Sequence, residues 1–242
     1  MSMEDQIILI DKPAGISSFG VVAKIRGKLK AEFGHKTKVG HTGTLDPFAT
    51  GLLILLSGKM TKKSNEFLKL DKVYEATLKL GFTSTTGDPE GKITKYDSTW
   101  AGDGAGGSPS ARRLSPSTMG EAATAGPAQS IIVSTLNSFI GKIRQTPPKF
   151  SAIKINGQRA YKLARKGADF EIPSREVEIY SIEILKYNYP ELTIRVHCSS
   201  GTYIRTLAED IGETLKTGAY LTALRRIKIG NYDVKDAEKL VL

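Results

Sequence analysis

A short segment rich in glycine and threonine, residues 40–53, carries the most chemically suggestive side chains of the sequence. It places one histidine, His41, five positions before one acid, Asp46. Pro47 disfavours helical backbone at the residue before it, so Asp46 should project from a stiff, extended stretch of chain. Gly43 has no Cβ and would let a ligand approach the backbone closely. Because Asp is also common in turns, this segment taken alone favours a turn over a catalytic acid.

The remaining histidines and the single cysteine offer less chemistry. Cys198 directly follows His197. Adjacent residues of a strand point to opposite faces, so these two side chains cannot readily form a catalytic pair. His35 is expected at a solvent-facing helix end. A lone cysteine excludes an internal disulfide, which fits a reducing compartment and predicts a cytoplasmic protein.

The net positive charge of the chain favours polyanionic partners but does not identify one. Lys and Arg outnumber Asp and Glu by 35 to 25, which gives a formal charge of +10. Such a field concentrates polyanions, so nucleic-acid binding and an ordinary basic protein stay about equally open. The longest apolar run, residues 52–56, is far shorter than the roughly 20 residues of a membrane-spanning helix. The acidic N-terminus is not typical of a signal peptide.

The elements that would position residues 40–53 are predicted from periodicity and turn signals. A strand at 6–10 should end in a turn at 11–15, and Ser17 or Ser18 should cap a helix that extends through Leu29. Other predicted elements are a loop at 34–46, strands at 72–80, 150–155, 176–185, 192–198 and 227–232, helices at 131–139, 159–165 and 202–215, and turns at 83–91 and 156–157. Together they predict a mixed domain of helices and several antiparallel strands.

Two segments stand out by composition. Residues 101–130 contain 23 Ala, Gly, Ser, Thr or Pro, a composition that cannot bury enough surface to offset its ordering entropy. We expect a flexible loop there, and a passive insertion is favoured over RNA contact by Arg112 and Arg113. Residues 141–180 carry nine Lys or Arg against four Asp or Glu, which favours contact with phosphates.

Several segments together resemble one known family. Residues 40–53 (GHTGTLDPFATGLL) are similar to the catalytic motif of the TruB family of pseudouridine synthases, which act on uridine 55 in the T loop of tRNA. Other matching motifs are DKPAGISS at 11–18, KVYEA at 72–76, QTPPKFSAIK at 145–154, YKLARKG at 161–167, GTYIR at 201–205 and LRR at 224–226. The resemblance covers nearly the whole chain except residues 97–130.

The resemblance implies a role for each matching residue. Asp46 would be the nucleophile, attacking either uracil C6 or ribose C1′, and Arg205 would pair with it and favour its charged form. The residues that would bind the substrate are His41, Tyr74, Tyr203, Leu224 and Lys12. His41 would hold the RNA with its base extruded, Tyr74 would stack on that base, and Tyr203 would contact the substrate. Without the resemblance, both tyrosines would be assigned to the core and Arg205 to a phosphate or the surface.

The resemblance also implies a fold and an organisation. The fold would be the α+β pseudouridine synthase fold, with a mixed, largely antiparallel sheet and flanking helices. Residues 1–242 would form one catalytic domain, with 97–130 as an insertion, 145–175 as an RNA-gripping thumb, and no C-terminal domain of the PUA type.

The reaction and its partners follow in the same way. The isomerisation needs no metal or other cofactor, and we expect a monomer that binds the T arm of tRNA without a membrane or an obligate protein partner. The alternatives are a non-catalytic RNA-binding protein that helps tRNA to fold, and a synthase that acts on another RNA.

Overall fold

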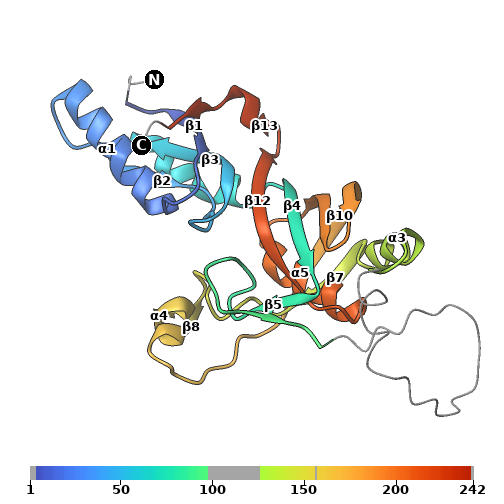
Figure 1. Cartoon of the computed structure of the whole chain (residues 1–242). Coiled ribbons are helices and arrows are strands. Elements are labelled where there is room, and N and C mark those ends of the chain that lie inside the picture. Colours follow the sequence, from blue (N-terminus) through green and yellow to red (C-terminus); the bar gives the residue numbers. More distant parts are fainter. Residues whose placement is uncertain (1–3, 98–125, 156, 241–242) are drawn as a thin grey trace, which may run out of the picture.

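The computed structural model describes residues 4–97, 126–155 and 157–240, through which a large sheet of ten strands runs (Figure 1). Its strands are β1 (Ile7–Lys12), β2 (Val39–His41), β3 (Thr50–Ser57), β4 (Lys72–Leu80), β7 (Gly141–Gln145), β10 (Arg175–Asn188), β11 (Glu191–Cys198), β12 (Ala219–Ile229), β13 (Tyr232–Asp233) and β14 (Glu238–Lys239). The main order is β14-β1-β3-β12-β4-β11-β10-β7, with β2 beside β3 and β13 beside β12. In this sheet β1–β14 and β3–β12 pair in parallel, and the other pairs are antiparallel. The expected α+β class with a largely antiparallel sheet is therefore confirmed.

The first half of the sheet is covered by α1 (Ser18–Phe33). The Ser17 hydroxyl accepts a hydrogen bond from the Gly20 N–H at 3.0 Å, and Gly34, with φ 75°, ends the helix. This confirms the predicted cap, because an orphan N–H of the first turn finds a partner. The inner face of α1 packs on β1 and β3 through a cluster that includes Val21, Val22, Ile25, Leu29, Leu53 and Leu55.

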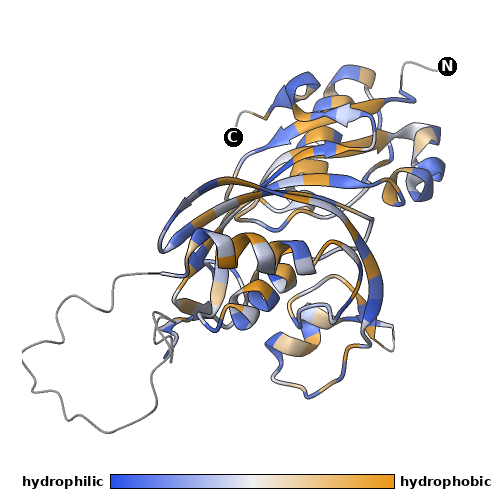
Figure 2. Ribbon diagram, turned by 90° about the vertical axis from the view of Figure 1, so that its right-hand side faces the viewer, coloured by the Kyte–Doolittle hydropathy of each residue, from blue (hydrophilic) through white to orange (hydrophobic). Residues whose placement is uncertain are grey.

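The second half of the sheet is covered by α3 (Gln129–Ser138) and α5 (Ile204–Thr214), which share one core cluster with β4, β10, β11 and β12. Along β4 and β11 buried residues alternate with partly exposed ones, as predicted for a strand with one face against the core. Figure 2 shows the same alternation of hydrophobic and hydrophilic residues along the long curved strands. By contrast β3 is buried on both faces, which explains its unbroken apolar run.

Strand β12 joins the two halves, because it pairs with β4 along most of its length and with β3 at Arg225 and Arg226. The strand predicted at 227–232 is confirmed only in part: β12 ends at Ile229, before Gly230 with φ 51°, and β13 begins at Tyr232. Residues 219–226 escaped prediction because two register shifts disturb the alternation of β12. Gly51 has φ 100° and lies so close to the Arg226 backbone that a Cβ would stand 2.3 Å from its carbonyl oxygen.

A small lobe projects from the body below the sheet (Figure 1). It contains the hairpin β8 (Lys154–Ile155) and β9 (Gln158–Arg159) and the short helix α4 (Ala160–Arg165). The strand expected at 150–155 is thus shorter than predicted, and the turn at 156–157 is described only at Gly157. Most of the segment expected as an insertion, 97–130, lies outside the described residues. The hairpin and helix occupy the region expected as a thumb.

The remaining elements are short. A second hairpin, β5 (Phe82–Ser84) and β6 (Ile93–Lys95), contains the turn predicted at 83–91, and the loop predicted at 34–46 contains β2. Helix α2 (Ser64–Leu68) follows a 3₁₀ turn at Gly58–Lys63, and another 3₁₀ turn lies at Val234–Asp236. Across residues 4–97, 126–155 and 157–240 there is no helix with the length and apolarity needed to cross a membrane.

Candidate active site

The loop between β2 and β3 displays Asp46 at the junction of the two halves of the sheet. The Ser18 hydroxyl donates to the Leu45 carbonyl at 2.9 Å and accepts from the Leu45 N–H at 2.8 Å. On the other side of Asp46, the Lys12 ammonium donates to the Pro47 carbonyl at 3.2 Å. Hydrogen bonds therefore hold the backbone on both sides of the acid.

Lys12, which was expected to bind the substrate, is buried beside the loop that carries Asp46. Its side chain is buried, and its ammonium donates to the carbonyls of Pro13, Ile16 and Pro47 at 2.9, 2.8 and 3.2 Å. These bonds use all three N–H donors of an ammonium. Burial lowers the pKa of Lys12 to about 8, although the Asp46 carboxylate opposes this shift. In this structure Lys12 braces the loop that carries Asp46, and its expected contact with the substrate stays a prediction.

Arg205 lies beside Asp46, as expected from the motif. Its Nε is 3.1 Å from Asp46 Oδ2, and its Nη1 is 3.0 Å from Asp88 Oδ2. The same guanidinium donates to the carbonyls of Thr86 at 3.0 Å and Phe150 at 2.8 Å. Only 4% of the Arg205 side chain is exposed, so these contacts fix its orientation. Arg205 is thereby aimed at a carboxylate that keeps 33% exposure toward the cavity.

Asp88 is a site residue that sequence reasoning missed. It lies in the turn of the β5–β6 hairpin, where its carboxylate also accepts from the Thr86 hydroxyl at 2.5 Å and the Glu90 N–H at 3.0 Å. The sequence offers only the dipeptide Asp88-Pro89 in a polar turn, which is common. Its burial depends on a partner 117 residues away, and no local pattern indicates such a partner.

The ionisation of Asp46 reflects opposing influences. Burial raises the pKa of Asp46 above its ordinary value, the Arg205 guanidinium opposes this, and the Asp88 carboxylate adds to it. The resemblance implied that the arginine would favour the charged form, and the direction of its influence on the pKa is as expected. The net pKa shift is nevertheless upward, because desolvation outweighs the paired cation.

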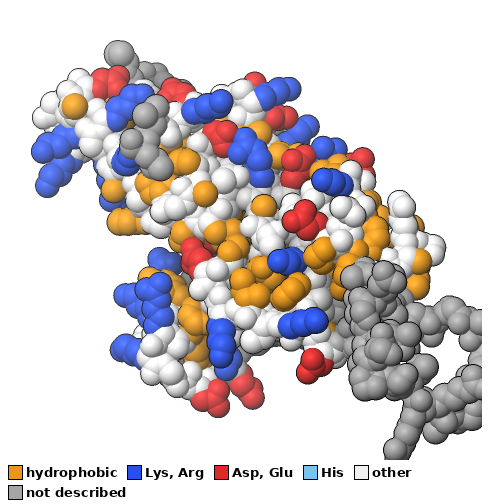
Figure 3. Space-filling model, viewed as in Figure 1, with side chains coloured by type: hydrophobic (Ala, Val, Ile, Leu, Met, Phe, Trp, Pro, Cys, Tyr) orange, Lys and Arg blue, Asp and Glu red, His pale blue; other side chains and the backbone are white. Residues whose placement is uncertain are grey.

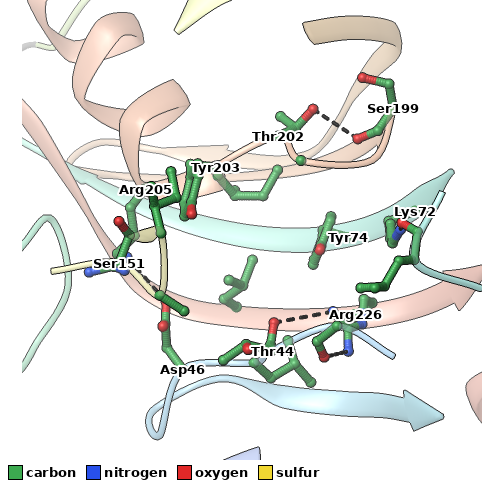
Figure 4. A pocket seen from close by; sticks show the side chains of 18 of the residues that line it. Thr44, Asp46, Lys72, Tyr74, Ser151, Ser199, Thr202, Tyr203, Arg205 and Arg226 are labelled. Atoms are coloured by element: carbon green, nitrogen blue, oxygen red, sulfur yellow. Dashed lines mark hydrogen bonds and ion pairs between the residues drawn. The ribbon is translucent and has the colours of Figure 1, made fainter. Parts of the chain in front are cut away.

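A cavity of about 350 Å³ opens above the loop (Figure 4). It brings together five residues named from the sequence: Asp46, Tyr74, Tyr203, Arg205 and Leu224. Tyr74 projects from β4 into the middle of the view, and Tyr203 and Arg205 stand at the start of α5 above Asp46. Elements far apart in the chain thus converge on one acid.

The two tyrosines are held differently. Tyr74 is 8% exposed, and burial raises the pKa of its phenol, so the group stays neutral. Tyr203 is fixed through its backbone: its N–H donates to Gln145 Oε1 at 3.0 Å, and its carbonyl accepts from Gln145 Nε2 at 3.3 Å. The Arg175 guanidinium lies 4.9 Å from the Tyr203 ring centre. Burial therefore holds the Tyr74 ring, whereas Tyr203 is held at its backbone with its ring beside a cation.

Arg226 is a second buried residue that sequence reasoning did not single out. Its side chain donates to the carbonyls of Leu52 at 2.8 Å, Gly43 at 3.1 Å and Thr44 at 3.4 Å. Arg226 is 1% exposed and lies 6.0 Å from the centre of the Tyr74 ring. The LRR motif pointed to this stretch of β12, but only the fold shows that the arginine joins the start of the Asp46 loop to strand β3.

His41 lies in an adjoining cavity of about 430 Å³, which also contains Asp46 and Arg205. Burial lowers the pKa of His41, and the charges of Arg226 and Arg159 lower it further, so the imidazole is neutral near pH 7. Figure 3 shows the hollow between the body and the α4 lobe, with Lys and Arg side chains on the lobe. A neutral imidazole therefore lines the same cavity as Asp46 and the cations Arg159 and Arg165.

Other chemically suggestive residues lie away from this site. His197 faces outward and pairs with Asp71 at 2.5 Å, while Cys198 is buried, which confirms that the two point to opposite faces. Burial raises the pKa of Cys198 to about 12. His35 is exposed at the end of α1, as expected. Among the described residues no cluster of three or more His, Cys, Asp or Glu side chains could hold a metal ion.

Comparison with known proteins decides the family. The profile described as TruB family pseudouridylate synthase (N terminal domain) matches residues 29–102 and 115–204. The chain belongs to the TruB family of pseudouridine synthases. A second profile, the tRNA pseudouridylate synthase B C-terminal domain, matches residues 205–241. The boundary between the two TruB profiles falls at the start of α5, inside the layer that covers the main sheet.

TruB relatives match over most of their length. The tRNA pseudouridine synthase B of Phocaeicola vulgatus is 43% identical, covering 96% of this chain and 89% of its own. The protein of the same name from Flavobacterium johnsoniae is 41% identical, covering 99% and 95%.

Solved structures agree on the fold. A Cbf5-Nop10-Gar1 complex matches with a TM-score of 0.64 and 27% identity over 97% of this chain and 52% of that one. An H/ACA RNP bound to a substrate RNA that contains 2'-deoxyuridine matches at 0.62 and 24%, covering 96% and 50%, and supports the fold alone. The TruB chain thus spans about half the length of each of these structural relatives.

Proposed function

We propose that this chain converts uridine 55 in the T loop of tRNA to pseudouridine, with Asp46 as the nucleophile. The observation that carries the proposal is the position of Asp46, held between the buried Arg205 and a cavity that contains Tyr74 and Tyr203. Family membership supports the reaction class, and the names of the curated relatives support tRNA as the substrate.

The reaction requires bonds to be exchanged without loss of atoms. Asp46 adds to uracil C6 or to ribose C1′, the N1–C1′ bond breaks, and C5 then bonds to C1′. C5 loses its proton, N1 gains one, and the carboxylate is released, so the product is an isomer of the substrate. Covalent attack divides one difficult step into easier ones, which suits a nucleophile that is ionised and fixed in place.

The cavity suits an extruded base. Flipping a base from its stack costs a few kcal/mol, which stacking and pocket contacts must offset. Tyr74 and Leu224 offer apolar surface in the cavity, and Tyr203 bounds it from α5. His41 stands in the adjoining cavity, where a neutral ring could replace the base that has left the stack. The α4 lobe supplies cations, including Arg159 and Arg165, that would contact the phosphates of the RNA backbone.

The decisive experiment compares wild type with Asp46→Asn on T-arm RNA and on full-length tRNA, followed by mapping of pseudouridine at single-nucleotide resolution. The matched control is Asp236→Asn, because Asp236 is an exposed acid in the 3₁₀ turn Val234–Asp236, outside both cavities. We expect modification at position 55 by wild type and by the control, and none by Asp46→Asn.

The other outcomes separate the alternatives. Turnover by Asp46→Asn at the wild-type rate would remove this acid from the mechanism. Modification at another position, or only of another RNA, would keep the chemistry and change the substrate. Tight binding of tRNA with no turnover by any variant would favour a protein that binds tRNA without modifying it.

A further inference from the structure

One aromatic side chain near the site is conspicuously exposed. Phe19, in the first turn of α1, is 64% exposed, more than any other large hydrophobic residue noted among the described part of the chain. It is not needed for the core, because α1 buries its opposite face against β1 and β3. Yet Phe19 lines the same cavity of about 430 Å³ as His41 and Asp46. Packing within the protein therefore does not explain its position.

A cation accompanies the ring along the same helix. The Arg26 guanidinium lies 5.6 Å from the Phe19 ring centre, and its Nη2 donates to the Val39 carbonyl at 2.7 Å. Positions seven apart lie on the same side of a helix, and Lys30 continues that side one turn further. All three side chains are exposed. The outer face of α1 thus begins with an aromatic ring in the cavity that contains His41 and Asp46, and it continues with two cations.

We propose that Phe19 stacks on an unpaired nucleobase next to the target uridine, while Arg26 and Lys30 bind phosphates of the strand that leaves the cleft. The inference rests on the proposed function and adds a second base-binding site outside the uracil cavity. Because Phe19 and Asp46 line one cavity, the stacked base must lie close to the target along the RNA.

The chemistry of Phe19, Arg26 and Lys30 on the outer face of α1 favours RNA over other partners. Unstacked bases of RNA loops are commonly held on aromatic rings and guanidinium planes, and such stacking tolerates any base. An apolar peptide would need more than one apolar residue, whereas the neighbours of Phe19 in the first turn are Ser18 and Gly20. Arg26 is tied to a backbone carbonyl on one side, which orients its guanidinium beside the ring before RNA arrives.

The test measures RNA affinity in the Asp46→Asn background, so that turnover does not complicate the measurement. The probe is T-arm RNA with 2-aminopurine at each loop position in turn. Stacking contributes about 1–3 kcal/mol per base, so Phe19→Ala should weaken binding about 5- to 140-fold. Phe19→Trp should bind at least as tightly as Phe19 and should quench 2-aminopurine at the same position. In the active protein, Phe19→Ala should raise KM and leave kcat nearly unchanged.

Two further variants provide matched comparisons. Tyr180→Ala removes another exposed aromatic, which is 44% exposed on β10, contacts the His197 ring at a tilt and lies outside both cavities, and should change affinity less than twofold. Arg26→Gln should reduce the slope of log affinity against log salt by about 0.7–1, as expected for one lost phosphate contact. Phe19→Ala removes no charge and should leave that slope unchanged.

The inference and the proposed function fail separately. If wild type modifies T-arm RNA while Phe19→Ala binds and turns over like Tyr180→Ala, the stacking site is wrong and the proposed function stands. If wild type binds T-arm RNA without modifying it, the proposed reaction fails, and the affinities still decide the stacking site. Loss of affinity in Phe19→Trp equal to that in Phe19→Ala would also overturn stacking.

Discussion

Two buried arginines flank the loop that carries Asp46, and they are held by different groups. Arg205 is paired with two carboxylates, those of Asp46 and Asp88. Arg226 instead donates to the backbone carbonyls of Gly43 and Thr44 in the loop and of Leu52 in β3, and no salt bridge to it is present in the described residues. Of the two arginines, Arg205 lowers the pKa of Asp46 more, while Arg226 lowers it less and chiefly holds the backbone.

The two arrangements respond differently to mutation. A carboxylate loses its partner charge when its arginine is removed, so both its pKa and its orientation change. A carbonyl has no charge to titrate. Removal of the arginine that donates to it therefore leaves an unsatisfied acceptor and a less fixed backbone. Variants at the two arginines should therefore differ in kind: one should chiefly change catalysis and its pH dependence, and the other should chiefly change stability.

The largest effect is expected from Arg205→Met. This variant keeps much of the volume but leaves the Asp46 and Asp88 carboxylates without their shared cation. We expect kcat on T-arm RNA to fall about 10²–10³-fold, the range for removing one preorganised electrostatic partner. Single-turnover kinetics at saturating enzyme would measure it. Arg205→Lys should recover little, because one ammonium cannot reproduce a guanidinium that contacts Asp46, Asp88 and two carbonyls.

If kcat of Arg205→Met fell only because the variant unfolds, the electrostatic role assigned to Arg205 would be contradicted. Urea denaturation of the same preparation distinguishes the two cases, since the proposed role requires a folded variant that binds RNA at near wild-type affinity.

The next effect concerns stability and is expected from Arg226→Met. Its removal leaves three carbonyls without this donor, and the one at Leu52 is buried, where an unsatisfied acceptor costs about 1–3 kcal/mol. We expect the free energy of unfolding to fall by about 1–3 kcal/mol, measured by urea denaturation, with kcat reduced about tenfold because the loop is less fixed. Arg225→Met is the matched control, because Arg225 is the adjacent arginine of β12 and forms a partly exposed ion pair with Asp11 of β1. An equal loss in both variants would show that Arg226 has no special role.

A smaller effect should appear in the pH dependence. In the proposed reaction Asp46 attacks as the ionised carboxylate, and the Asp88 charge raises the pKa of Asp46 whereas the Arg205 charge lowers it. Asp88→Asn should therefore move the acid limb of kcat/KM to lower pH, and Arg205→Met should move it to higher pH. Profiles of the three proteins over about pH 4–9 would test this. Shifts of both variants in the same direction would contradict the assigned charges.

Much of the fold and part of the site could be predicted from the sequence, because those signals are local. The alternation of β4 and the Ser17 cap of α1 depend on neighbouring residues, and the structure confirms both. The Asp46 loop was recognisable because its motif is contiguous. Its approach to Arg205 was expected only through the family, since 159 positions separate them in the sequence.

The missed residues depend on contacts that no local pattern encodes. Arg226 reaches Gly43 across 183 positions, and Asp88 reaches Arg205 across 117. Lys12 was expected to bind the substrate through the family resemblance alone, and the sequence did not indicate that three backbone carbonyls surround its ammonium. In each case the sequence identifies a charged residue in a motif, while the identity of its partner follows from how the two halves of the sheet meet.

The smallest effect is a gain in stability from Asp46→Asn. Because burial raises the folded-state pKa of Asp46 above its unfolded value, the folded protein favours the protonated acid. The resulting stabilisation is present below the unfolded pKa and is lost as pH rises through the folded pKa. At pH 7 the charge is therefore a net burden, and an uncharged amide should raise the urea midpoint slightly. The difference from wild type should shrink as the pH falls toward about 4, near the ordinary pKa of an aspartate. An Asp46→Asn protein that is less stable than wild type at pH 7 would mean that pairing with Arg205 outweighs desolvation, and the contrast between the two arginines would then extend to stability.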